Sequence, residues 1–351
     1  MNTLKIINAH AAGIDVGSEA MHVSIAGGPA QIFGTMTADL YMLRNHLKEE
    51  GVTTVAMEAT GVYWFCLYEI LQVSGLEVVM VNGRHVKNLP GRKTDVADCQ
   101  WLATLHAHGL LRGGFVPDTE VRRLQDYVRL RNDHISLAAS HVQHMQKALD
   151  RMNIKVHEVI SSLTGSSGMA MLRAIVGGER DPQKLLALCN VQIRKNKADR
   201  ILAALQGTWN REHIFALTQA LSCWDFYQTC IFECDAKIAE VLAEMPTKDD
   251  GANGDQEGGK PTEKAKAAPK ERKGASANAP KIPNLHELIT GLFGGRDASV
   301  LPGITDYSTL QLTSEVGRDL SRWPTAKHFT SWLGLAPQAS QGTVRLPRAH
   351  N

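Results

Sequence analysis

The chain has 351 residues, of which 43% are hydrophobic and 21% charged, and its formal net charge is only +2. This length exceeds what one hydrophobic core usually organises, so we expect two or three domains. No apolar run reaches the roughly 20 residues that span a bilayer, and the first residues lack the long apolar core of a signal peptide. We therefore expect a globular cytoplasmic protein with no membrane partner, and its charge excludes a general polycation.

The N-terminal third of the sequence alternates between strand-like and helix-like segments. The expected strands, of which the first two are joined by a tight polar turn typical of a hairpin, are 12–18, 21–27, 31–37, 53–58 and 76–82. The expected helices, each ending at a glycine, are 38–51, 61–75 and 93–109. This order predicts a mixed sheet covered by helices. It fits a ribonuclease-H-like α/β fold, although other α/β folds share it.

The middle of the chain is rich in helix formers. Residues 119–160 contain few breakers, and apolar residues recur at three- and four-residue steps, including Leu130, Leu137, Val142, Met145 and Leu149. This pattern predicts one long helix or half of a helical hairpin, and a coiled coil is a further interpretation. More helices are expected at about 181–206 and 211–244.

The composition changes sharply near residue 247. Residues 247–281 lack any bulky apolar side chain and mix Gly, Pro, Ala, Lys and Glu, so we interpret them as a disordered linker. A small helical segment follows. The sequence thus predicts an α/β domain, a helical region, a linker and a helical C-terminal domain, at 9–118, 119–246, 247–281 and 282–351.

Four carboxylates are placed where they can converge. Asp15 lies at the end of the first strand, Glu58 ends a later strand, and Asp95 and Asp98 are three residues apart on one helix face. Converging carboxylates repel one another unless cations lie between them. Ligation by oxygen alone favours Mg²⁺ or Mn²⁺. Two such ions about 4 Å apart can bind the attacking and leaving oxygens of a phosphodiester displacement.

Each acid also has a purely structural interpretation. Asp95 sits in a first helical turn, where an acid favours the helix dipole, and Asp98 is near Lys93 and Arg92 in sequence. Asp15 is close to a turn and is interpretable as a turn residue, and Glu58 taken alone is interpretable as a surface acid. The strand positions favour the metal site, because Asp15 and Glu58 follow apolar runs where an unpaired charge is costly.

Local basic clusters suggest contact with nucleic acid. Two segments, 83–93 and 121–131, concentrate cations that can meet phosphates, namely Arg84, Lys87, Arg92, Lys93, Arg122, Arg123, Arg129 and Arg131. The alternative is a solvated helix face. In the segment LPGI (301–304), Gly303 predicts a turn whose backbone amides meet a DNA phosphate, with a plain interhelix turn as the alternative.

Several motifs together resemble one protein family. AGIDVGSEAMHVSIAG, VAMEATGVYWFCLYEIL and GRKTDVADCQWLATLHAHGLL resemble the N-terminal domain of DEDD transposases of the bridge-RNA-guided insertion-sequence family. HVQHMQKALDRMN and LRAIVGGERDP resemble the longer-chain branch of that family. LPGITDYSTLQLTSEVG and SRWPTAKHFTSWLGLAP resemble its C-terminal transposase domain.

The resemblance implies an activity and partners. It implies a RuvC-like N-terminal domain in which Asp15, Glu58, Asp95 and Asp98 hold Mg²⁺, a helical dimerisation region, and a C-terminal domain with a nucleophilic serine. It further implies donor and target DNA, a structured guide RNA, a homodimer or homotetramer, and a location near the nucleoid.

The end of the sequence departs from the family's pattern. After GLAP the family expects a serine, two glycines and a lysine, whereas this chain reads QASQGTVRLPRAHN, which makes Ser340 the nearest match. The sequence therefore leaves three hypotheses open: a transposase, a metal-dependent nuclease or Holliday-junction resolvase, and an inactive nucleic-acid-binding remnant.

Overall fold

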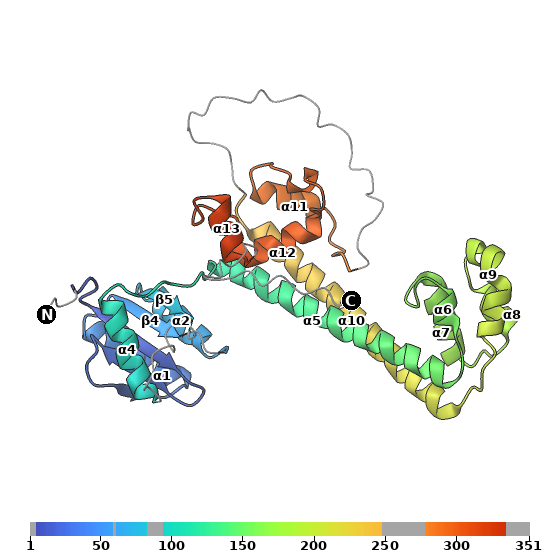
Figure 1. Ribbon diagram of the computed structural model, residues 1–351, viewed down its shortest axis with the longest axis horizontal. Helices are drawn as coiled ribbons and strands as arrows, with labels where there is room; N and C mark the ends of the chain where they lie inside the picture. The colour runs from blue at the N-terminus through green and yellow to red at the C-terminus, as the bar shows by residue number, and fades with distance from the viewer. Residues whose placement is uncertain (1–4, 59–60, 83–93, 248–277, 335–351) are drawn as a thin grey trace, which may run out of the picture. The chain divides into compact units, whose positions relative to one another are not determined.

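A computed structural model of the chain describes residues 5–58, 61–82, 94–247 and 278–334 (Figure 1). The chain divides into two compact units, Met1–Val116 and Pro117–Asn351. Most of the predicted linker, 247–281, lies outside the described residues. Within the described part, no helix is both long enough and apolar enough to cross a membrane.

The first unit contains a five-stranded mixed sheet in the order β3-β2-β1-β4-β5. Its strands are β1 (Ala11–Val16), β2 (Met21–Ile25), β3 (Gln31–Phe33), β4 (Thr54–Glu58) and β5 (Glu77–Val81). β1 pairs antiparallel with β2 and parallel with β4, and β4 pairs parallel with β5. This topology confirms the predicted mixed α/β fold and is consistent with a ribonuclease-H-like domain.

Helices cover both faces of this sheet. Helices α1 (Thr37–Glu49) and α2 (Trp64–Val73) share a core with alternate residues of the central strands, including Ile14 and Met57. On the other face, Leu102 of α4 (Asp95–Ala107) packs with Ala56 and Val81. The period-two alternation of the strands thus separates a deep apolar face from the face that carries α4.

The predicted third strand, 31–37, is longer than the observed one. β3 ends at Phe33, and α1 begins at Thr37. The Asp39 carboxylate accepts a hydrogen bond from the backbone N–H of Met36, which fixes the start of α1 at that point.

The second unit is organised by two long helices, α5 (Thr119–Arg151) and α10 (Arg211–Glu244), which lie along each other (Figure 1). The expected long helix is observed as α5, which ends at Arg151, and the rest of the helix-forming region to about residue 160 contains the separate short helix α6. Asn153 adopts a left-handed conformation with φ 56°, which ends the helix. Leu130 and Leu137, which we expected in the apolar stripe, are 45% and 44% exposed. The coiled-coil interpretation stays a prediction.

A separate core lies at each end of the α5–α10 pair. One contains the short helices α6 (Val156–Val159), α7 (Ser166–Val176), α8 (Pro182–Ala187) and α9 (Val191–Ala204). The expected helix 181–206 is interrupted between α8 and α9, where the Asn190 side chain accepts from the backbone N–H of Ile193 and starts α9. The other core includes α11 (Leu285–Leu292) and α12 (Asp306–Val316). The described segment also contains the 3₁₀ turn η1 (Ala298–Val300) and α13 (Ala326–Trp332).

Arg131 connects four segments of the second unit. Its side chain is 2% exposed, and its Nε lies 2.6 Å from Oδ1 of Asp235 on α10. It also donates to the carbonyl of Asn278 and to the hydroxyl of Tyr307 on α12. Asp235 accepts in addition from the backbone N–H of Lys281. The buried pair is therefore hydrogen-bonded on both sides, which a desolvated ion pair requires.

We expect Asp235→Ala to lower the free energy of unfolding of the second unit by about 3–5 kcal/mol, because Arg131 is left buried without its counter-charge. Denaturant unfolding of the full chain, followed by circular dichroism, measures this. The matched control is Asp225→Ala, which breaks the exposed Arg173–Asp225 pair and should cost less than about 1 kcal/mol. Equal losses in the two variants would contradict the role given to Arg131.

Candidate metal centre

Asp15 lies near the end of β1, on the face of the sheet that α4 covers. It shares that face with Gly13, two residues earlier. Across the hairpin, Asp15 is paired in register with His22 of β2. In the parallel direction, Ile14 is paired with Met57 of β4, so Asp15 and Glu58 occupy neighbouring positions at the carboxyl ends of adjacent strands. Glu58 is only 7% exposed.

The first turn of α4 supplies the two remaining carboxylates. The Thr94 side chain accepts a hydrogen bond from the backbone N–H of Ala97 and caps the helix. Asp95 and Asp98 follow in that first turn, with Asp95 exposed and Asp98 half-buried.

A close approach between α4 and β1 brings these acids to the sheet. A Cβ atom on Gly13 would lie 2.3 Å from the backbone N of Ala103 and 2.6 Å from the carbonyl O of Cys99. Such distances are possible only because Gly13 has no side chain. The helix therefore lies directly on the strand, with its N-terminal acids near the strand's carboxyl end.

Three of the carboxylates act electrostatically on the fourth, Asp15. The pKa of Asp15 rises from 3.8 to about 6, first because the group is desolvated and then because Glu58, Asp95 and Asp98 carry like charges nearby. His22 opposes this shift. Crowded carboxylates in a partly dry site are the electrostatic condition that a bound cation relieves.

His22 is a candidate ligand that sequence reasoning missed. One ligand atom each of Asp15, His22 and Asp95 lie within 4.8 Å of one another. Glu58 and Asp98 are outside that group, although both raise the Asp15 pKa. The signal was present in the hairpin, since its register places His22 directly opposite Asp15.

This donor set fits a divalent cation. Carboxylate oxygens suit Mg²⁺ and Mn²⁺, and an added imidazole nitrogen favours Mn²⁺ over Mg²⁺. The residues that would hold this cation are Asp15, Glu58, Asp95 and Asp98, with His22 beside them.

The remaining predicted site residues are placed as follows. Arg84, Lys87, Arg92, Lys93 and Ser340 lie outside the described residues. Gly303 adopts φ 83° in the turn before α12, with its neighbours exposed, and its contact with DNA stays a prediction.

The structure corrects the interpretation of the arginines on α5. Arg131 and Arg122 are 1% and 4% exposed, so a phosphate cannot reach them. Arg122 donates to the carbonyl of Pro117 and the hydroxyl of Thr119. Arg129 and Arg123 are exposed but bind Glu315 and Glu244. Arg122 and Arg131 therefore serve internal contacts, whereas contact of the exposed Arg123 and Arg129 with phosphate stays a prediction.

The strand order and the clustered acids are consistent with a ribonuclease-H-like DEDD domain. Residues 12–154, which contain all four acids, match the IS110-type DEDD transposase family. Residues 298–345 match the family described as "Transposase IS116/IS110/IS902 family". The chain therefore belongs to the IS110 family of DEDD transposases. A search of curated proteins found no match.

We expect Gly13→Ala to destabilise the first unit by about 1–3 kcal/mol or more, because the added methyl group meets helix backbone and forces α4 away from β1. The same displacement should abolish stabilisation by Mg²⁺ or Mn²⁺. Thermal unfolding with and without the cation measures both effects. In the control Gly113→Ala, the new Cβ meets only a Val79 methyl group at 3.2 Å. Full cation response in Gly13→Ala would contradict the positioning role.

The raised pKa of Asp15 makes the stability of the first unit depend on pH. Because the folded state holds this proton more tightly than the unfolded state, the group destabilises the cation-free fold as pH rises from 3.8 through about 6. In a chelator at pH 8, Asp15→Asn should therefore raise the melting temperature of the first unit.

Divalent cation should stabilise the wild type at pH 8, by up to about 3 kcal/mol at a hundredfold excess over Kd. This stabilisation by the cation should be smaller at pH 5, where protons compete with the cation for the carboxylates. It should be absent in Asp15→Asn. Calorimetry at both pH values tests this, with Glu49→Gln on α1 as the control acid. An equal cation effect in Asp15→Asn would refute the site.

Proposed function

We propose that this transposase cleaves and exchanges DNA strands during movement of an insertion sequence, with Asp15, Glu58, Asp95 and Asp98 as its metal-binding residues. The observation that supports this most directly is that Glu58, Asp95 and Asp98 all raise the pKa of Asp15, in a site built from two strand ends and one helix turn. Bound Mg²⁺ or Mn²⁺ would stabilise charge on the phosphate oxygens of the DNA.

The chain's own residues fix the geometry of this site. Two carboxylates are carried by paired strands and two by a capped helix turn, so their backbone positions are set by the fold before any ligand binds. Such preorganisation avoids reorganisation of the site during the reaction. His22 is placed to act as a further ligand or to orient Asp15.

The serine step and the partners complete the proposal. Ser340 is the candidate nucleophile, and its context in the family's C-terminal domain is the support for it. A structured guide RNA would select donor and target DNA by base pairing while the protein reads RNA shape. A homodimer or homotetramer would bring two DNA partners together, near the nucleoid.

A second candidate function is that of a metal-dependent nuclease or Holliday-junction resolvase. It is favoured by the fact that all four carboxylates and His22 belong to the first unit. That chemistry would not require Ser340 or an RNA.

One reaction separates these functions. Purified protein is incubated with element-end RNA, donor DNA and target DNA, with and without Mg²⁺, and recombinant junctions are quantified. We expect junctions that depend on both RNA and Mg²⁺. Asp95→Ala should lower their rate at least about a hundredfold, since several kcal/mol of charge stabilisation are lost. Ser340→Ala should also abolish exchange.

Glu49→Ala, an acid on the opposite face of the sheet, should leave the rate unchanged. Cutting that needs Mg²⁺ but not RNA would support the resolvase instead. Binding without any strand change would indicate an inactive remnant, and full activity of Asp95→Ala would overturn the metal site.

A further inference from the structure

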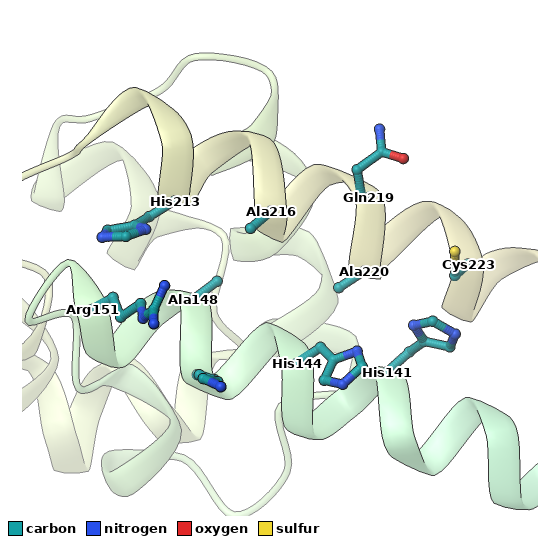
Figure 2. A pocket seen from close by; sticks show the side chains of 10 residues that line it. His141, His144, Ala148, Arg151, His213, Ala216, Gln219, Ala220 and Cys223 are labelled. Atoms are coloured by element: carbon teal, nitrogen blue, oxygen red, sulfur yellow. The ribbon is translucent and has the colours of Figure 1, made fainter.

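A groove between α5 and α10, near the α6–α9 end of the pair, has a volume of about 330 Å³ (Figure 2). His141, His144 and Arg151 extend from α5, and His213 extends from α10 across from them. The floor contains small residues, Ala148 and Ala220, which are buried. Alternation of small and long side chains therefore creates the hollow.

The polar lining of this groove is basic. Lys147 and Arg151 belong to it together with the three histidines, and the described residues contribute no carboxylate to its lining. Both cations are exposed, and neither has an ion pair or hydrogen bond within the part of the chain that the structure describes. They differ in this from the arginines at the other end of α5, which bind internal partners.

These groups follow one face of the helix. Residues 141, 144, 147 and 151 are separated by steps of three or four, so their side chains form a row. At 1.5 Å per residue the row is about 15 Å long. A single small anion fills only part of such a row, whereas a nucleic-acid strand, with about one phosphate per 3.4 Å of helix axis, places several charges along it.

The surrounding segment reinforces this charge. Residues 141–213 contain 11 Lys and Arg but only 6 Asp and Glu, whereas the whole chain has 38 and 36. The segment that carries the groove residues of α5 is therefore more basic than the chain as a whole.

A metal site is the main alternative for a groove with three histidines and Cys223. Within the described residues, the sets of three ligand atoms that lie within 4.8 Å are at Asp15 and at Asp150, not here. The His141 and His144 rings lie 5.5 Å apart on α5, His213 is on α10, and His141 also stacks on Tyr227 with ring centroids 5.6 Å apart. Nδ1 of His141 is buried with no hydrogen-bond partner among the residues described.

We propose that this groove binds the phosphodiester backbone of a nucleic acid, DNA or RNA, without reading its sequence. Lys147 and Arg151 contact successive phosphates, and the histidines add hydrogen-bond donors along the same strand. The inference rests on the proposed function, which supplies nucleic-acid partners, but it concerns a surface of the second unit remote in sequence from the four acids.

The test compares two double variants of the full chain that remove the same charge. Lys147→Gln with Arg151→Gln empties the groove of its cations, and Lys195→Gln with Arg200→Gln removes two exposed cations of α9. Fluorescence anisotropy gives Kd for labelled duplex DNA and for a structured RNA over a range of salt concentrations. The groove variant should bind roughly tenfold more weakly or worse at 0.1 M salt, and its salt slope should fall by about two.

The α9 variant should stay within about twofold of wild type, and Lys147→Arg with Arg151→Lys should retain binding because charge is kept. A loss of affinity for only the DNA probe or only the RNA probe would identify which nucleic acid the groove binds. Unchanged Kd and slope, equal loss in the α9 variant, or stoichiometric Zn²⁺ binding that needs His141 and His144 would overturn the proposal.

The outcome is separable from that of the catalytic proposal. Asp15→Asn should fail to exchange strands, whereas the groove variant is judged by probe binding. If the protein exchanges no strands but the groove variant loses affinity, only the catalytic proposal fails. If strands are exchanged and the groove variant binds normally, only the groove proposal fails.

Discussion

The contact between α4 and β1 is the constraint on which the candidate metal centre depends. It exists because Gly13 has no Cβ, which lets the backbone of Cys99 and Ala103 occupy the space that any other residue would fill. A helix held at that distance presents its first turn beside the carboxyl ends of β1 and β4. The crowding of charge at Asp15 is therefore a consequence of backbone packing, and the same packing makes a cation the natural counterpart of the site.

The second unit uses charge in two different ways. In the N-terminal half of α5, arginines form ion pairs with carboxylates of α10 and α12. Of these, the buried Arg131–Asp235 pair joins segments that are distant in sequence. Near the other end, Lys147 and Arg151 have no such partners among the residues that the structure describes, and they line a groove to which those residues contribute no carboxylate. Helix α5 thus carries cations that form internal ion pairs and other cations that remain accessible to an anionic ligand. The local amino-acid composition does not distinguish the two groups.

Sequence patterns predicted the α/β unit well because its signals are local. Strand alternation, glycine stops and the three-residue spacing of Asp95 and Asp98 are each set by a few neighbouring residues. Sequence-based prediction failed where contacts between residues far apart in the chain decide which side chains are buried or lie in the site. The histidine opposite Asp15 depends on hairpin register, and the burial of Arg122 and Arg131 depends on how the second unit packs.

By itself, the sequence determined the family of this protein, the order of its strands and helices, and the four acids at strand ends and in one helix turn. These follow from periodicity and motif order, which a linear chain records directly. Only the tertiary structure decided that α4 lies against β1, that His22 joins Asp15 and Asp95, and which arginines and lysines remain accessible. Those facts depend on distances between residues far apart in the chain, which only the packed fold sets.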